Sequence, residues 1–214
     1  MPRLRLSFRK KRRAAPLPGA RIVVGLGNPG RHYARHRHNV GARALERLSR
    51  LLDLPLNDRG KLALSGGKQT AYGPVVLARP RTFMNESGRA IQSLLNQHRA
   101  QPPDLILIVD DLDLEVGRIR VRAGGSDAGQ KGMRSIKEVL GSLDFPRVRI
   151  GIGRPYVDDR PSHHPDVVAD HVLSDPIPEE AEALDDAERR AADAVIAILR
   201  DGVEAAMNTF NADR

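Results

Sequence analysis

The sequence contains no cysteine and no tryptophan, and only seven of its 214 residues are phenylalanine or tyrosine. Without cysteine the chain cannot form a disulfide scaffold, a cysteine-ligated zinc site or a thiol nucleophile. The longest unbroken aliphatic run, Leu105 to Val109, is far shorter than the ~20 residues that a membrane span needs. The few, scattered aromatic residues also argue against a surface that stacks on single-stranded bases. We therefore expect a soluble, cytoplasmic protein that makes no contact with a membrane.

The charged residues that are present are unevenly distributed along the chain. The formal net charge is +8; residues 1–20 carry seven basic groups and no acid, whereas residues 176–214 carry a net charge of −6. The intervening residues 21–175 are therefore basic, with a net charge of +7. A basic body with an acidic C-terminal segment indicates a polyanionic partner that binds one face. If that partner is RNA, its phosphates supply most of the contacts.

The length suits one α/β domain, in which we expect order to begin at Arg21. Residues 1–20 are basic, free of acids and interrupted by two prolines, and we interpret them as a disordered extension. They lack the continuous apolar stretch of a secretory signal. An organellar address is the alternative, although the alternation of Leu4, Leu6 and Phe8 does not suit an amphipathic helix.

The body of the chain, residues 21–214, alternates short apolar runs with segments of helical periodicity. We predict strands at about 22–27, 74–78, 105–110, 118–123 and 147–153, and helices at about 39–52, 85–98, 131–141, 179–199 and 201–210. This alternation is typical of an α/β fold with a largely parallel sheet. Residues 155–167, rich in proline, aspartate and histidine, form a loop long enough to be a lid.

Three predicted strands end in polar segments, and sites in open α/β sheets form at the carboxyl ends of strands. These segments are residues 25–41, 79–88 and 109–117. The first begins with Gly-Leu-Gly-Asn-Pro-Gly, which matches the dinucleotide pattern GxGxxG. However, Pro29 and a polar stretch delay the helix to about Asn39, and no strand ending in an acid follows about 20 residues later. A nucleotide-binding enzyme is therefore disfavoured, and titration with NAD would test it.

Two groups of residues have a superficial likeness to metal sites. Asp110, Asp111 and Asp113 form either a solvated turn or a cation site, but three acids on one loop do not by themselves predict a metal. His32 and His36 are four residues apart, yet no glutamate lies between them in the zincin arrangement. We expect no metal at either place.

His38 is the candidate general base. It lies at the start of the predicted helix at 39–52, where the helix dipole favours a neutral imidazole. A neutral imidazole accepts a proton near pH 7 when its other nitrogen is held as a donor. Asp110, at the end of a predicted strand, is the natural partner. The alternatives are that His38 merely caps the helix at the surface, or that His32 or His36 is the base.

Five segments together resemble the bacterial peptidyl-tRNA hydrolase family. They are VVGLGNPGRHYARHRHNVG (23–41), RPRTFMNESG (79–88), DDLDLEVGRIRVRAGGSDAGQKGMRSI (110–136), FPRVRIGIGRP (145–155) and VVADHVLSDP (167–176). The resemblance covers nearly the whole body of the chain. It implies a single α/β domain with a mixed, mostly parallel sheet surrounded by helices. It also implies a monomer that hydrolyses the ester between peptide and tRNA without a cofactor.

The resemblance implies roles for four residues in the chemistry. The catalytic histidine of the family's RHN triplet corresponds to His38, and the aspartate that holds it corresponds to Asp110. The amides of the NPG turn and of the FMNxSG segment correspond to Asn28 and Asn85. We expect His38 to activate water and amide donors to hold the oxyanion. An acceptor oxygen of Asn28 would bind the first peptide N–H, which would spare ordinary aminoacyl-tRNA.

The resemblance also implies residues that bind the substrate. Tyr33 and Phe83 correspond to residues that line the channel for the tRNA 3′ end and the peptide, and Arg122 and Arg149 to residues that hold phosphates. Many members have His-Asn-Gly where this chain has Gln-Lys-Gly at 130–132. Lys131 therefore replaces an amide that contacts the substrate, and we expect its ammonium to donate to an oxygen of the tRNA 3′ end.

A non-catalytic RNA-binding relative is the remaining alternative. Phosphate binding requires none of Asn28, His38, Asn85 and Asp110, so their joint presence favours an enzyme. Incubation with N-acylated aminoacyl-tRNA and its unblocked counterpart distinguishes the two possibilities.

Overall fold

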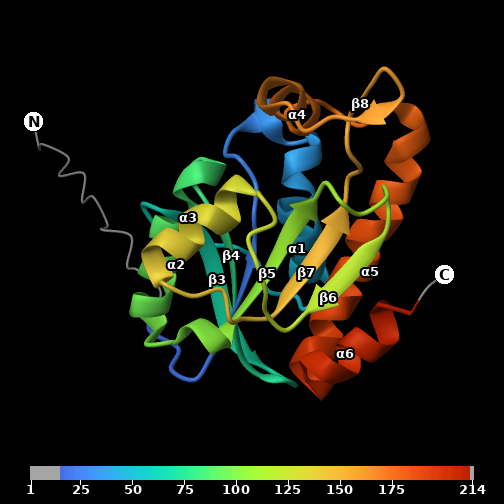
Figure 1. Cartoon of the computed structure of the whole chain (residues 1–214). Coiled ribbons are helices and arrows are strands. Elements are labelled where there is room, and N and C mark those ends of the chain that lie inside the picture. Colours follow the sequence, from blue (N-terminus) through green and yellow to red (C-terminus); the bar gives the residue numbers. More distant parts are fainter. Residues whose placement is uncertain (1–14, 213–214) are drawn as a thin grey trace, which may run out of the picture.

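A seven-stranded mixed sheet forms the centre of the computed structural model, which describes residues 15–212 (Figure 1). The strand order is β2-β3-β4-β1-β5-β7-β6. The strands are β1 (Arg21–Gly25), β2 (Asp58–Arg59), β3 (Ala63–Thr70), β4 (Gly73–Pro80), β5 (Leu105–Asp111), β6 (Ile119–Arg122) and β7 (Arg147–Gly151). A separate small hairpin consists of β8 (Tyr156–Val157) and β9 (Arg160–Pro161).

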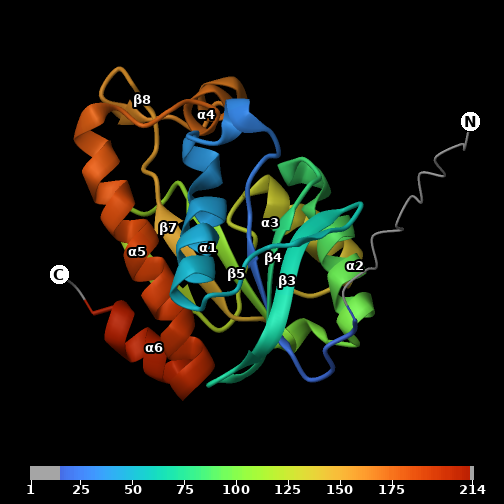
Figure 2. The ribbon, with the colours of Figure 1, turned by 180° about the vertical axis from the view of Figure 1, so that it is seen from behind.

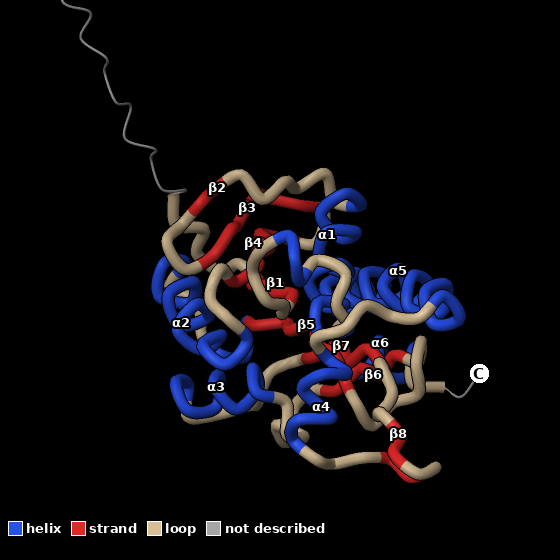
Figure 3. The backbone as a smooth tube through the Cα atoms, turned by 90° about the horizontal axis from the view of Figure 1, so that it is seen from above, coloured by secondary structure: helices blue, strands red, loops and turns tan. Residues whose placement is uncertain are grey.

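The four central strands, β4, β1, β5 and β7, are parallel to one another, and the strands towards both edges pair antiparallel with their neighbours. β3 pairs antiparallel with β4 and β2 with β3, while β6 pairs antiparallel with β7 at the other edge. The expected fold class, one α/β domain with a mixed, mostly parallel sheet, is confirmed. Because parallel strands finish at the same edge, the segments after β1, β4 and β5 meet at one end of the sheet. Figure 3 shows the molecule from this end, where helix α4 (Pro165–Val172) and the connecting loops lie over the sheet.

Helices cover both faces of the sheet (Figures 1 and 2). They are α1 (Val40–Leu51), α2 (Ser87–His98), α3 (Lys131–Leu140), α4 (Pro165–Val172), α5 (Pro178–Asp201) and α6 (Val203–Phe210). In β1, Val23 packs into the core under α1 and α5, whereas Ile22 and Val24 pack into the core under α2 and α3. A strand buried on both faces is apolar at every position, which explains its unbroken aliphatic run. Within residues 15–212 no helix has the length and apolar character needed to cross a membrane.

The sequence did not predict strands β2, β3, β8 and β9 or helix α4, of which β3 and α4 are the longest. β3 contains two adjacent glycines, which weaken a strand pattern, but Gly66 is required because a Cβ there would lie 2.1 Å from the carbonyl oxygen of Pro55. α4 begins at Pro165, inside the expected lid loop at 155–167, and is only eight residues long. So short a helix shows too few turns for its periodicity to be recognised.

The described part of the N-terminal segment packs against the body. Leu17 contacts the core under α2 and α3, and Ala20 is fully buried in it. The backbone N–H of Leu17 also donates to Nδ1 of the buried His98, 3.2 Å away, and burial lowers the pKa of His98. Ordered structure therefore begins before Arg21, the residue at which we had expected it to begin. The rest of the expected extension, residues 1–14, lies outside the described residues.

Candidate active site

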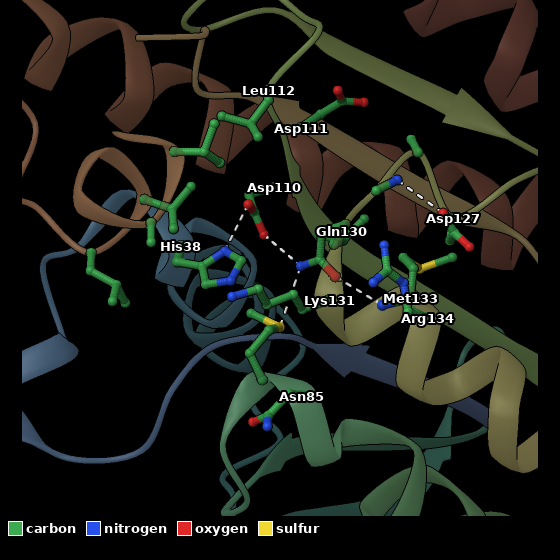
Figure 4. Close-up of a pocket in the computed structure, with 18 of the residues that line it drawn as sticks. His38, Asn85, Asp110, Asp111, Leu112, Asp127, Gln130, Lys131, Met133 and Arg134 are labelled. Carbon is green, nitrogen blue, oxygen red and sulfur yellow. Dashed lines mark hydrogen bonds and ion pairs between the residues drawn. The ribbon is translucent and has the colours of Figure 1, made fainter. Parts of the chain in front are cut away.

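A cavity of about 670 Å³ opens at the end of the sheet where β1, β4 and β5 finish (Figure 4). Its walls come from the segments after these strands, from the glycine-rich loop at 123–130 that precedes α3, and from α4. The structure brings together the residues that were expected to form the site, with one exception. Those that line the cavity are Asn28, Tyr33, His38, Phe83, Asn85, Asp110, Lys131 and Arg149.

His38 and Asp110 form a buried hydrogen-bonded pair. His38 Nδ1 lies 2.8 Å from Asp110 Oδ2, and both side chains are buried. An ionised carboxylate accepts hydrogen bonds but cannot donate them, so Nδ1 carries the proton and Nε2 keeps its lone pair. Within residues 15–212, His38 Nε2 forms no hydrogen bond. The imidazole is therefore oriented as a base with a free lone pair.

Close packing of glycines places the turn that carries His38. This turn, the 3₁₀ helix η2 (Arg37–Asn39), directly precedes α1. A Cβ on Gly41 would lie 2.4 Å from the carbonyl oxygen of Ile108, and one on Gly25 would lie 2.3 Å from the carbonyl oxygen of Gly41. Only glycine permits so close an approach. The start of α1, and with it His38, therefore lies directly beside the end of β5.

Gln130 holds the second oxygen of Asp110, a contact that the sequence did not predict. Its Nε2 donates to Asp110 Oδ1 over 2.9 Å, while its Oε1 accepts from the backbone N–H of Met133 over 2.8 Å and so caps α3. Because the oxygen must face that N–H, the NH2 group must face the carboxylate. The one available signal was the position of Gln130 immediately before a predicted helix, where a cap is expected.

Asn28 is held in place by its neighbours. Its backbone N–H donates to Asn39 Oδ1 over 2.9 Å, and its carbonyl oxygen accepts from Asn39 Nδ2 over 3.0 Å. Its side-chain oxygen accepts from the backbone N–H of Met84 over 2.9 Å. One of the two lone pairs of that oxygen, which we expect to bind a peptide N–H of the substrate, is therefore used by Met84. The NH2 group has no partner among the described residues, so Asn28 keeps both N–H donors and one acceptor position.

Asn85, Tyr33 and Phe83 lie at the cavity wall that follows β1 and β4. Asn85 belongs to the 3₁₀ helix η3 (Met84–Glu86) and its side-chain amide forms no hydrogen bond within residues 15–212. Tyr33 and Phe83 meet edge to face, with ring centroids 6.2 Å apart, and Phe83 is 51% exposed. An apolar ring that is half exposed beside polar amides suits a substrate with both kinds of surface.

The two arginines expected to hold phosphates lie in different environments. Arg149 lines the cavity and forms an ion pair with Asp111, whereas Arg122 lies on edge strand β6 outside the cavity lining. In the register of β6 and β7, Arg122 lies opposite Arg147 and Arg120 opposite Arg149. All four therefore project from one face of this edge of the sheet.

Arg147 was not predicted and fixes the glycine-rich loop. Its guanidinium donates to the carbonyl oxygens of Gly125, Ser126 and Leu143 over 2.6–3.1 Å. Burial, together with the nearby charge of Arg149, lowers the pKa of Arg147 to about 10, although Asp144 partly opposes this shift. Both Nη groups donate to carbonyl oxygens of the chain itself, so this side chain holds the loop.

The other histidines and acidic residues that the sequence offered as alternatives do not form a second site within residues 15–212. Neither His32 nor His36 lines the cavity; burial lowers the pKa of His36, and Asp175 partly opposes that shift. Asp111 pairs with Arg149 and Asp113 with Arg154, so these carboxylates have cationic partners in the protein. Within residues 15–212 no group of three or more histidine and acidic side chains is arranged to hold a metal.

The loop that matches the dinucleotide pattern also lacks the required context. The segment after β1 continues through two 3₁₀ turns, η1 (Arg31–Tyr33) and η2, before α1 begins at Val40. In dinucleotide-binding proteins a helix begins within the glycine loop, so that its N-terminus faces the pyrophosphate. The geometry here does not provide that N-terminus.

Comparison with known proteins finds consistent similarity along the chain. The family model described as peptidyl-tRNA hydrolase matches residues 22–214. The peptidyl-tRNA hydrolase of Caldanaerobacter subterraneus is 43% identical over 190 residues, covering 89% of this chain and 98% of that protein. That of Chloroflexus aurantiacus is 44% identical over 193 residues, with coverage of 89% and 98%. The crystal structure of peptidyl-tRNA hydrolase from Acinetobacter baumannii matches with a TM-score of 0.82 at 32% identity, covering 94% of this chain and 99% of that one.

Proposed function

This chain belongs to the peptidyl-tRNA hydrolase family and hydrolyses the ester that joins a peptide to tRNA, and we propose that His38 is the general base of that reaction. The observation that carries this proposal is the buried pair of His38 and Asp110, with Nδ1 of the imidazole held by the carboxylate and Nε2 free. An imidazole in this state accepts a proton from water, and the resulting hydroxide attacks the peptidyl carbonyl carbon.

Asp110 stabilises the imidazolium that forms, without itself taking the proton. The tetrahedral intermediate then collapses, its ester C–O bond breaks, and the imidazolium returns the proton to the ribose oxygen that leaves with the tRNA. The products are a peptide with a free carboxylate and a tRNA with a free terminal hydroxyl. This sequence of steps uses water and side chains of the protein and requires no cofactor.

Asn28 and Asn85 are proposed to bind the reacting ester and the peptide. The free NH2 group of Asn28 is suited to donate to the oxyanion, a contact typically worth a factor of ~10² to 10³ in kcat. Asn85 keeps both halves of its amide available, so its oxygen is suited to accept the N–H of the last peptide bond. An unblocked aminoacyl-tRNA has an ammonium group in place of that N–H and would be placed differently.

The tRNA is proposed to be held by cationic and aromatic groups around the cavity. Lys131 is the first residue of α3, is exposed and lines the cavity, which suits an ammonium that donates to an oxygen of the tRNA 3′ end. Arg122 and Arg149 are proposed to contact phosphates, with Tyr33 and Phe83 beside the 3′ end and peptide. We further propose that the enzyme acts as a cytoplasmic monomer, because one chain supplies every residue of this site and contains no cysteine.

The test is turnover of an N-acetylated aminoacyl-tRNA and of its unblocked counterpart. We expect the wild type to hydrolyse the blocked substrate in preference. His38→Ala should lower kcat by about 10² to 10⁴ while tRNA is still bound, because it removes only the base. His32→Ala is the matched control, since His32 lies outside the cavity lining and should be dispensable. Wild-type kcat in His38→Ala, or an equal loss in His32→Ala, would refute the assignment.

A further inference from the structure

Arg37, the residue directly before His38, is buried and forms several hydrogen bonds. Its side chain is only 6% exposed. Nε donates to Glu180 Oε2 over 3.1 Å, and Nη2 donates to the same oxygen. Nη1 donates to Ser174 Oγ and to the carbonyl oxygen of Asp175, each over 2.7 Å. The backbone N–H of Arg37 donates to the carbonyl oxygen of Ser174 over 3.0 Å.

All of these partners lie where α4 joins α5. Ser174 follows the end of α4, where its hydroxyl donates to the carbonyl oxygen of His171 over 2.8 Å. Glu180 lies in the first turn of α5, and it also accepts the backbone N–H of Ile177 over 3.3 Å. The segment between β1 and α1 lies beside α4 in Figure 1, and η2 contacts α4. Arg37 therefore joins η2 to the junction of α4 and α5.

The same junction places one wall of the cavity. Val168, Ala169 and Val172 of α4 line the cavity together with His38. His171 fixes the other side of α4, because its Nε2 lies 3.2 Å and 3.1 Å from the carbonyl oxygens of Ile152 and Gly153 after β7. The base and the α4 wall thus share one connecting side chain, that of Arg37.

The geometry points to Arg37 as a positioning residue that sets His38 and the α4 wall at a fixed distance across the cavity; this inference rests on the proposed role of His38. Arginine suits this task because its planar group presents donors in several directions at once. Glu180 is suited as its partner because a carboxylate is stabilised at a helix N-terminus. A lysine at position 37 would keep the charge, but its three donors radiate from one nitrogen and do not reproduce the bonds that Nε, Nη1 and Nη2 make from separate positions.

The test compares Arg37→Lys with Arg47→Lys in the full-length protein, with N-acetylated aminoacyl-tRNA as substrate. Arg47 is the matched control because it pairs with Asp185 and Glu188 of α5 and, within residues 15–212, forms no hydrogen bond or ion pair with η2 or with Ser174. We expect Arg37→Lys to lower kcat by about 10- to 100-fold, since a displacement of ~1 Å at a catalytic group has an effect of this size. We expect KM to rise less than kcat falls. Arg47→Lys should keep kcat within about twofold.

Two further measurements separate positioning from a purely structural role. The NMR signal of the His38 Nδ1 proton should shift or broaden in Arg37→Lys and stay unchanged in Arg47→Lys. A purely structural arginine would instead lower the melting temperature without changing kcat of the folded protein or that signal. Ser174→Ala removes one bond of the guanidinium and keeps the pair with Glu180, so it serves if Arg37→Lys does not fold. It should lower kcat by several-fold and move the same signal.

Wild-type kcat in Arg37→Lys, or an equal loss in Arg47→Lys, overturns the inference. If Arg37→Lys is unfolded, wild-type kcat and an unchanged signal in Ser174→Ala overturn it. His38→Ala measured in parallel identifies which proposal has failed. Activity in His38→Ala would refute the proposed role of His38 as the general base. Loss of activity in His38→Ala together with wild-type activity in Arg37→Lys would refute only the positioning role of Arg37.

Discussion

At the scale of single residues, Gln130 performs two tasks through the two halves of one amide. Its oxygen caps α3 and its NH2 group holds the carboxylate that orients His38. A neutral histidine at this position would also offer one acceptor and one donor nitrogen. The amide differs in that it does not titrate, so the donor to Asp110 is present at every pH.

Gln130→Glu separates these two tasks. A glutamate can still accept the N–H of Met133, but it cannot donate to Asp110 and adds a negative charge beside it. We expect kcat to fall while the melting temperature changes little. The acid limb of the pH–rate profile should move to higher pH, because a further carboxylate favours the protonated imidazole. Steady-state kinetics from pH 5 to 9 measure both effects.

Gln130→Ala is the control for the helix cap. It removes both hydrogen bonds, so it should lower kcat and also reduce the stability of the fold by ~1 kcal/mol through loss of the cap. A Gln130→Glu variant with the kcat and pH profile of the wild type would show that the bond to Asp110 has no catalytic importance.

At the scale of elements, the N-terminal segment divides at about residue 15. Residues 15–20 include Leu17, which contacts the core, and Ala20, which is fully buried in it. Residues 1–14 carry all seven basic groups of the segment. Truncation at these two points should therefore have different consequences.

Deleting residues 2–14 should leave the melting temperature and kcat unchanged, and should weaken tRNA binding at low salt because seven cationic groups are lost. Deleting residues 2–20 should also lower the free energy of unfolding, by roughly 1–3 kcal/mol, because apolar side chains leave the core. Urea denaturation of the two truncated proteins measures the difference. Equal stability of both would show that Leu17 and Ala20 contribute nothing to the fold.

At the scale of the whole molecule, charge differs between the cavity and the helices α5 and α6. The cavity is lined by five cationic side chains against three carboxylates; the cationic residues are Lys131, Arg134, Arg147, Arg149 and Arg154. The acidic segment 176–214 contains α5 and α6, which lie on the other face of the sheet from α2 and α3 (Figures 1 and 2). We expect this polarity to favour the approach of a polyanion to the cavity.

Lys131 provides a test of that polarity. Lys131→Ala should raise KM more than it lowers kcat, which is the mark of lost uniform binding. If the lysine contacts a phosphate, the slope of log K against log salt should also become shallower by about one unit or slightly less. Lys137→Ala is the matched control, because Lys137 is exposed on the same helix and does not line the cavity. Identical KM and salt slopes in the two variants would place Lys131 outside the substrate contacts.

The sequence by itself determined the fold class and the residue types at the cavity. Runs such as Leu105 to Val109 are apolar at every position because the strand is buried on both faces, so periodicity and length were sufficient to predict them. His38 and Asp110 were predicted as a pair because parallel strands finish at one edge and therefore bring their following segments together. β3 escaped prediction because Gly66 is explained only by its contact with Pro55, a contact between separate segments.

Only the tertiary structure decided which donors and acceptors remain available to a substrate. The side-chain oxygen of Asn28 accepts a hydrogen bond from Met84, 56 residues away, and Arg37 bonds to Glu180, 143 residues away. Gln130 reaches Asp110 because a helix cap and a strand end meet in space. A hydrogen bond depends on distance and angle within a few tenths of an ångström. Residue identity specifies what a side chain can donate or accept, whereas packing of distant segments selects the partner.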